Sequence, residues 1–452
     1  MHYAQTIREK IKLFIVILWP ILVTQIGLFA MNFFDTLMSG RAGTDDLAGV
    51  AIGSSLWLPL FTGLNGVLLA VTPIVSQFIG SGERNKIGHT VTQALYVAVL
   101  IGLAVILVGG FLLEPILLFM NLEPAVHQIA KHYLIGLAIG IVPLFVSNVI
   151  RNFFDAQGHT KITMIITLMA IPFNILLNYG LIFGAFGLPE LGGVGAGYAT
   201  AITYWIIVGF SIWMTVKVEE VRPFRLFVNW YIPSPVTWKE ILKIGIPIGL
   251  SIFFEASIFA AVTLMVGAMF DTVTIAAHQA AINFTTLIFM VPLSISMALT
   301  IMVGYEVGAK RIHDARQYTR LGVIASIGIL SISSIFLYLF REQVAMLYSD
   351  HRGVVIMVKQ FLIFAIFYQL SDAVQSSLIG VLRGYKDVTI PFFIALLSYW
   401  GVGIPSGFIL AVYTQLGPYG YWIGITIGLT CAAVGFYLRL RLIQSRLDVR
   451  EI

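Results

Sequence analysis

The sequence predicts an all-α integral membrane protein of twelve transmembrane helices, built as two parallel six-helix lobes. Three observations lead to this fold class: very few charged residues, twelve apolar runs long enough to span a bilayer, and an internal repeat of half the chain. Of the 452 residues, 58% are hydrophobic and 11% are charged, whereas about a quarter are charged in a soluble protein. So few charges cannot cover a water-exposed surface, so the bilayer must be the solvent for most of the chain.

The apolar runs set the number of helices, because a spanning helix needs about 20 mostly apolar residues. We expect spans at residues 13–38, 47–79, 90–113, 127–150, 162–185, 194–216, 240–268, 275–306, 319–340, 354–380, 389–413 and 418–440. The polar, basic segment before the first run is followed by no small-residue cleavage motif. We therefore expect the first helix to remain in the mature protein.

The orientation follows from the distribution of Lys and Arg between the loops. If the N-terminus is cytoplasmic, 22 of the 27 basic residues, Arg383 among them, fall in cytoplasmic segments. The sequence therefore predicts a multi-pass protein of the cell (plasma) membrane with both termini in the cytoplasm. Topology accounts for the net charge of +5, so we expect no nucleic-acid partner. The single cysteine, Cys431, excludes an intramolecular disulfide.

The two halves of the chain match each other at an offset of 227–228 residues that drifts to 223 further along. The matches include Pro20 with Pro247, Gly40 with Gly267, Thr72 with Thr300 and Gly80 with Gly308. Six helices are an even number, so both halves have the same orientation in the membrane, as in transporters that rock two lobes about a central site. We expect an N-terminal lobe at 1–216, a cytoplasmic linker at 217–239 and a C-terminal lobe at 240–452. The aromatic residues of the linker indicate an interfacial segment: Phe224, Phe227, Trp230 and Tyr231.

Three carboxylates fall inside predicted spans: Asp35, Glu255 and Asp372. A charge at the centre of a spanning helix costs roughly 2.5–3.5 kcal/mol on insertion scales, and the basic residues cluster at helix ends. Lys359 lies about three turns from Asp372. An acid without a basic partner either stays protonated or holds a metal cation or a cationic substrate. Hydrogen bonding of a protonated acid to a neighbouring helix is the alternative for any one of the three.

Neutral oxygen ligands accompany these acids. Tyr368 and Asp372 are four residues apart and share a helical face. Asn174 and Asn178 are also four apart, shortly after Pro172, which frees backbone groups. These oxygens suit a small cation, although packing is an equal alternative for Tyr368, and interhelical hydrogen bonding for the Asn pair.

The absence of catalytic motifs narrows the function classes. The chain contains no G-x-x-x-x-G-K-[ST] phosphate loop and no H-E-x-x-H motif. We therefore expect a transporter driven by an ion gradient and not an enzyme. We expect no cofactor.

Several segments resemble the multidrug and toxic compound extrusion (MATE) family in its NorM branch. The first-helix signature is Trp19-Pro20 followed by Phe34-Asp35-Thr36-Leu37-Met38-Ser39-Gly40-Arg41, and the second-helix motif is Val71-Thr72-Pro73-Ile74-Val75-Ser76-Gln77. Phe254-Glu255-Ala256 and Tyr368-Gln369-Leu370-Ser371-Asp372 resemble the counterparts in the second lobe. The likeness covers essentially the whole chain.

The resemblance implies an antiporter that exchanges cationic, amphipathic drugs and dyes for Na⁺, or alternatively H⁺, by alternating access. It also implies a second-lobe cation site, with Na⁺ as the expected ion, at Glu255, Tyr368 and Asp372. The implied first-lobe site consists of Asp35 with Asn174, Asn178 and Thr200. Some relatives carry Asp where this chain has Asn178, which removes one charge from that site. We expect a monomer in contact with membrane lipid.

Two alternatives belong to other functional classes. A flippase for lipid-linked precursors would share the two-lobe architecture, but its anionic cargo needs basic residues deep in the spans, and none is found there. A membrane-embedded enzyme would need a catalytic motif that the sequence lacks.

Overall fold

The computed structural model describes residues 3–451, with side chains as far as Leu447. All elements assigned in this part of the chain are helical, and no strand occurs among them. By length and composition, 11 helices can cross a membrane, or 12 if the bent pair α5 (Pro124–Ala138) and α6 (Ile141–Ala156) forms one span. The predicted all-helical membrane fold with twelve spans is confirmed.

The bend between α5 and α6 is 50°, where the sequence predicts one continuous helix over 127–150. Two features explain it. Pro143 in the first turn of α6 has no N–H for the carbonyl of the preceding turn. Gly140 lies so close to α8 (Gly193–Lys217) that an added Cβ would approach the Cα of Ala201 to 2.6 Å. The break therefore lets this span pack closely against α8.

The chain divides into two compact units, and the boundaries between the units fall inside two long helices. Unit 1 comprises Trp19–Gly249, and unit 2 comprises the segment up to Leu18 together with the chain from Leu250 onward. The divisions fall next to Pro20 in α1 (Ile7–Ala42) and Pro247 in α9 (Pro235–Met269), the two prolines that the internal repeat aligns. The predicted lobe boundaries remain a prediction.

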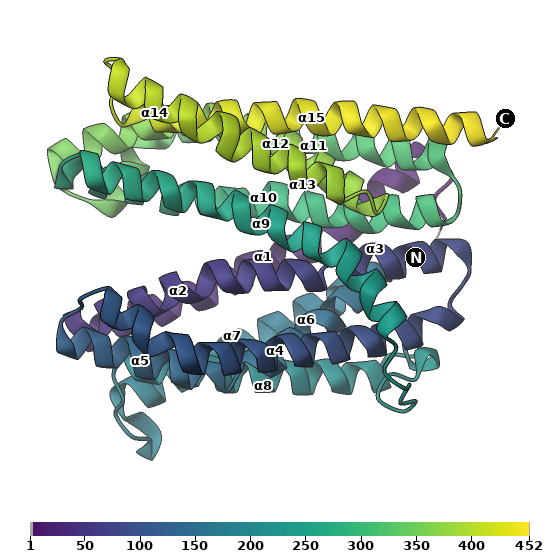
Figure 1. The fold of residues 1–452 in the computed structure, drawn as a ribbon, viewed down its shortest axis with the longest axis horizontal. Helices are drawn as coiled ribbons and strands as arrows, with labels where there is room; N and C mark the ends of the chain where they lie inside the picture. Colours follow the sequence, from purple (N-terminus) through teal and green to yellow (C-terminus); the bar gives the residue numbers. More distant parts are fainter. Residues whose placement is uncertain (1–2, 452) are drawn as a thin grey trace. The chain divides into compact units, whose positions relative to one another are not determined.

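In unit 1, α8 packs against α5, α6 and α7 (Thr160–Phe183) (Figure 1). Small residues make this packing possible: a Cβ on Gly197 would lie 2.3 Å from the carbonyl oxygen of Tyr133. The unit also contains α2 (Thr44–Leu68), α3 (Val71–Ser81) and α4 (Asn85–Phe119), the short turns η1 (Ala185–Gly187) and η2 (Arg222–Phe224), and parts of α1 and α9.

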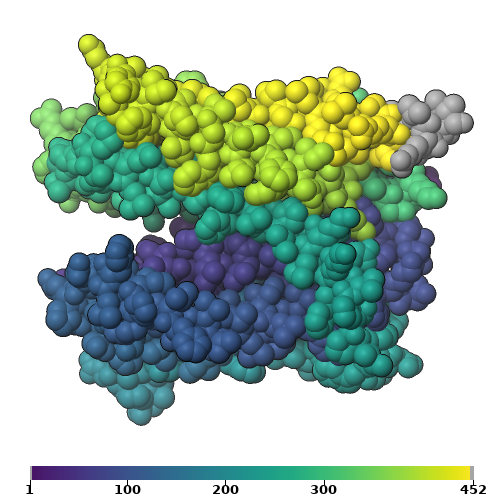
Figure 2. Space-filling view, viewed as in Figure 1, coloured from purple at the N-terminus to yellow at the C-terminus, as the bar shows by residue number. Residues whose placement is uncertain are grey.

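The outer surface of the helices is apolar, as lipid contact requires. In unit 1, α4 lies on the surface seen in Figure 2. Its Leu107 and Phe111 are 64% and 74% exposed. In unit 2, Ile324 of α11 (Ile312–Tyr348) is 70% exposed. Exposed side chains of this kind favour a bilayer over water as the surrounding medium.

The segment between α8, which ends at Lys217, and α9, which begins at Pro235, contains the predicted interfacial aromatic residues. Part of it is anchored to unit 1: Tyr96 donates to the backbone carbonyl of Tyr231 at 2.9 Å, and Phe224 packs edge-on against Phe153. Trp230 is 68% exposed, in agreement with an interfacial position.

In unit 2, α12 (Arg352–Gly384) is the central helix and packs against α10 (Thr272–Gly308), α11 and α15 (Tyr419–Glu451). The span predicted at residues 389–413 is divided into three segments: α13 (Thr389–Leu396), the π-helical segment η3 (Leu397–Gly403) and α14 (Ile404–Tyr413). Helices α14 and α15 lie side by side.

The contact of α12 with α10 depends on Gly380. A Cβ at this position would lie 2.3 Å from the carbonyl oxygen of Ser296, and Thr300 donates to the Gly380 carbonyl at 2.9 Å. We expect Gly380→Ala to lower the stability of the purified protein by about 1–3 kcal/mol, because the helices must separate. The measurement is the thermal unfolding midpoint in detergent.

Gly328→Ala is the matched control, because no atom lies within 4 Å of the added Cβ on α11. Its midpoint should stay the same or rise slightly, since Ala favours helix over Gly. Equal midpoints for the two variants would contradict the close-packing argument.

Candidate functional site

Asp35 lies in unit 1 within a buried polar cluster between α1, α7 and α8. It is 6% exposed. Asn178 Nδ2 donates to Asp35 Oδ1 at 2.5 Å, and Thr200 Oγ1 donates to Asp35 Oδ2 at 2.8 Å. Asn178 Nδ2 also contacts Asn174 Oδ1 at 3.2 Å. The structure thus brings together all four residues predicted for the first site.

Helical spacing explains how three elements reach one carboxylate. Asn174 and Asn178 are one turn apart on the same face of α7, and both are completely buried. Among the described residues, the amide oxygen of Asn178 has no hydrogen-bond partner. Buried polar atoms without partners are costly, so the cluster has capacity for a further ligand or proton.

A second acidic cluster lies in unit 2, between α9 and α12. Asp372 is 4% exposed and Glu255 is half-buried. The side-chain nitrogen of Gln375 connects the two acids: it lies 2.7 Å from Glu255 Oε1 and 2.8 Å from Asp372 Oδ1. Ser376 Oγ also donates to Asp372 Oδ1 at 3.0 Å. The predicted pair Glu255 and Asp372 therefore forms one site.

Helix α12 places these groups on one face, because Asp372, Gln375 and Ser376 follow at spacings of three and four residues. A third element completes the cluster: Tyr399 in η3 donates its hydroxyl to Gln375 Oε1 at 2.9 Å. Gln375, Ser376 and Tyr399 are not among the residues predicted for this site. The spacing from Asp372 could have identified the first two, but nothing in the sequence places η3 beside them.

Tyr368 lies one turn from Asp372 on α12 and is 5% exposed. Its ring packs edge-on against Trp422, with the ring centres 5.7 Å apart, and its hydroxyl forms a hydrogen bond with Thr285. Tyr368 thus borders the acidic cluster, while the hydrogen bonds to the two acids come from Gln375 and Ser376.

Arg383 is a basic residue whose charge acts on the second cluster. The distribution of basic residues predicts a cytoplasmic loop position for it, but it lies in the last turn of α12 and is 8% exposed. It interacts electrostatically with Glu255, although within the described chain no Lys, Arg or His nitrogen lies within 4.0 Å of Glu255, Asp372 or Asp35. Arg383 therefore acts on Glu255 through its charge without forming an ion pair with it. Lys359 pairs with Glu342 at 3.0 Å instead of approaching Asp372.

The charges and ligand types define what the second cluster can hold. Two carboxylates and one guanidinium leave a net charge of about −1 when both acids are ionised, which matches one monovalent cation. Among the described residues no three His, Cys, Asp or Glu side chains come together as a metal site. A cation here would therefore be held by two carboxylates and neutral oxygens, as hard cations prefer.

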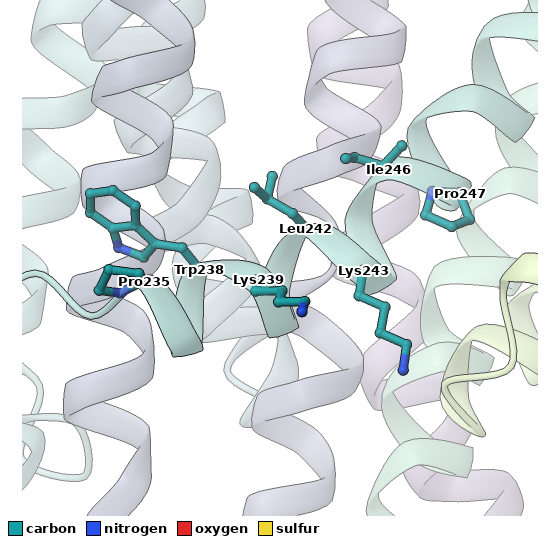
Figure 3. Close-up of a pocket in the computed structure, with 7 residues that line it drawn as sticks. All are labelled: Pro235, Trp238, Lys239, Leu242, Lys243, Ile246 and Pro247. Carbon is teal, nitrogen blue, oxygen red and sulfur yellow. The ribbon is translucent and has the colours of Figure 1, made fainter.

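Two cavities differ in character from the acidic clusters. The first is a groove of about 570 Å³ along the first turns of α9, and Figure 3 draws the residues that line it. Its lining includes two lysines and no acid: Pro235, Trp238, Lys239, Leu242, Lys243, Ile246 and Pro247. A cavity of about 40 Å³ in unit 1, lined in part by Asn148 and Arg151, is too small for a drug-sized molecule, which needs about 300 Å³ or more.

Comparison with known sequences gives matches over the whole chain. The family model MatE matches residues 20–180 and 247–409. The chain is 55% identical over 448 residues to a probable multidrug resistance protein NorM of Halalkalibacterium halodurans, covering 99% of this chain and 98% of the relative. It is 50% identical over 451 residues to the protein of the same description in Bacillus subtilis, with both chains covered completely.

Solved structures of low sequence identity share the fold. The eukaryotic MATE transporter AtDTX14 superposes with a TM-score of 0.84 at 22% identity, covering 98% of both chains. A MATE structure described as the bent conformation gives a TM-score of 0.87 at 18% identity, covering 97% of this chain and 96% of the other. The family model matches both halves of the repeat, and the relatives match from end to end. The chain therefore belongs to the MATE family of membrane transporters.

Proposed function

We propose that this protein is a cation-coupled antiporter that exports cationic, amphipathic drugs and dyes across the cell membrane. The observation that carries the proposal is the pair Glu255 and Asp372, joined by one amide nitrogen and without a basic group in direct contact. Two acids that share one amide and have no ion pair bind a cation or a proton readily when a pathway opens, because Arg383 compensates only part of their charge. The names of the NorM relatives support the class of exported compound.

The coupling ion in this proposal is Na⁺, with H⁺ as the alternative. One monovalent cation that enters down 100 mV releases about 2.3 kcal/mol, and a tenfold concentration gradient adds about 1.4 kcal/mol. Together these are enough to drive a several-hundred-fold gradient of a neutral solute at one-to-one exchange. The protein acts by alternating access, as a monomer with both termini in the cytoplasm, where the excess of Lys and Arg places them.

The first test is dye efflux from proteoliposomes in which a Na⁺ gradient and a pH gradient are imposed separately. We expect an inward Na⁺ gradient to drive efflux at least severalfold faster than the same vesicles without a gradient. Efflux driven only by the pH gradient would assign H⁺ as the coupling ion. Efflux driven by neither gradient would contradict the antiporter.

Removal of a carboxylate tests the second cluster. Glu255→Gln or Asp372→Asn should lower ion-driven efflux at least about tenfold, because one charge no longer attracts the cation. The control is Glu342→Gln, which breaks an exposed ion pair with Lys359 and should leave efflux within about twofold. Unchanged transport and ion dependence in either cluster variant, at normal expression, would remove Glu255 and Asp372 from the mechanism.

The first cluster is tested through Thr200, whose hydroxyl donates to Asp35. Thr200→Val leaves Asp35 Oδ2 without this donor, so we expect efflux to fall by about an order of magnitude, equivalent to one lost hydrogen bond to a charged group. Thr203→Val on the same helix is the control, because Thr203 donates only to the backbone carbonyl of Ala199. Equal losses in both variants would show that the contact with Asp35 has no role in transport.

A further inference from the structure

Gln375 occupies a particular position in the second cluster, since its side-chain nitrogen lies between the two carboxylates. The distances to Glu255 Oε1 and Asp372 Oδ1 are 2.7 and 2.8 Å, and Gln375 is 1% exposed. An ionised carboxylate only accepts hydrogen bonds. The two hydrogens of the amide nitrogen therefore satisfy both acids at once.

The opposite end of the amide is held just as specifically. Tyr399 Oη donates to Gln375 Oε1 at 2.9 Å, and Tyr399 is 1% exposed. An amide has one donor end and one acceptor end, so the acids on one side and the tyrosine hydroxyl on the other fix the same orientation. With this orientation the positive end of the amide dipole faces the acids.

A cation bound by Glu255 Oε1 and Asp372 Oδ1 competes with this arrangement, because the amide hydrogens point to the same two oxygens. Rotation of the terminal amide by half a turn removes the conflict, and this torsion has a broad, roughly two-fold energy profile. Gln375 Oε1 then faces the cation as a hard oxygen ligand. Together with Glu255, Asp372 and Ser376 Oγ it makes a set of oxygen donors suited to Na⁺.

We propose that the Gln375 amide is a built-in substitute for the coupling Na⁺, and that Na⁺ binding turns it and reverses its hydrogen bond with Tyr399. This inference rests on the proposed function, namely that the coupling cation binds between Glu255 and Asp372. After the turn, the Gln375 nitrogen donates and the tyrosine hydroxyl accepts, so the hydroxyl hydrogen loses the acceptor that Gln375 Oε1 provided. The amide and the Na⁺ therefore compete for the same two acids.

The position of Tyr399 gives this reversal a structural consequence. Tyr399 lies in the π-helical segment η3, and such segments occur often at functional sites. The next residue, Trp400, donates its ring N–H to the backbone carbonyl of Phe254 at 3.2 Å, one residue before Glu255. The segment η3 is thus in contact with both helices that carry the acids. Its hydrogen bond to Gln375 therefore differs between the state with the amide and the state with Na⁺.

Competition between the amide and Na⁺ predicts that the loss of one hydrogen bond increases the affinity for Na⁺. In Tyr399→Phe the donor that holds Gln375 Oε1 is lost, so the amide turns more easily and Na⁺ should bind about 3–10-fold more tightly, corresponding to one hydrogen bond. A tyrosine that only supported the fold would give the opposite result, weaker binding. The control is Tyr413→Phe at the end of α14, where the side chain is 77% exposed.

The experiment measures binding of ²²Na⁺ to the purified full-length protein in detergent, at constant ionic strength and without any drug. Wild type should bind Na⁺ saturably, Glu255→Gln should bind it at least tenfold more weakly, and Tyr413→Phe should match wild type. Gln375→Glu, which replaces the amide by a third carboxylate of nearly the same shape, should also bind Na⁺ at least tenfold more tightly. The second variant keeps the inference testable if Tyr399→Phe fails to fold.

The outcomes separate this inference from the proposed function. Saturable Na⁺ binding that is lost in Glu255→Gln but unchanged or weakened in both Tyr399→Phe and Gln375→Glu would overturn the role of Gln375 and leave the antiporter intact. Absence of Na⁺ binding to wild type, together with efflux driven by a pH gradient, would overturn the Na⁺ substitute but not cation coupling. Absence of both Na⁺ binding and ion-driven efflux would overturn the proposed function itself.

Discussion

The hydrogen bonds to Asp35, Glu255 and Asp372 are the interactions on which the interpretation of this protein depends. Each acid lies within a long apolar helix, where an uncompensated charge is expensive. In both units the protein meets this cost with neutral donors in place of a direct ion pair: Asn178 and Thr200 in unit 1, and Gln375 in unit 2. Neutral donors can give way to a cation without leaving a second buried charge behind. An acid held in this way is stable when empty and still able to bind.

The packing of the helices holds the acids and their hydrogen-bond donors in position. Close approach of α12 to α10 at Gly380 makes α12 the central helix of unit 2, and this helix carries Asp372, Gln375 and Arg383. Because the backbone of α12 is fixed by its neighbours, the side chains on one face keep their positions relative to Glu255 on α9. In the proposed exchange of the amide for Na⁺, the parts that move are small: a terminal amide and a hydroxyl hydrogen.

Much of the site could be predicted from sequence. The apolar composition made Asp35, Glu255 and Asp372 conspicuous, and the four-residue spacing placed Asn174 beside Asn178 on one face of a helix. The family resemblance then grouped residues from different helices, and the structure confirms that Asp35, Asn174, Asn178 and Thr200 are in contact through hydrogen bonds. Gln375, Ser376 and Tyr399 were missed, because neutral polar residues are common in spanning helices and carry no signal of their own. The sequence predicts a loop position for Arg383, since a basic residue near a helix end normally reaches the interface.

The sequence by itself determined the membrane fold, the number of spans, the repeat and the identity of the buried acids. These features follow from the cost of charge in lipid and from helical periodicity, which act locally along the chain. Only the tertiary structure decided which neutral group faces each acid, where the span of α5 and α6 bends, and that Tyr399 reaches Gln375 across 24 residues of sequence. Hydrogen-bond partners are chosen by side-chain direction and by contact between separate helices. One residue of additional π-helical winding in η3 is enough to change which side chain faces the site.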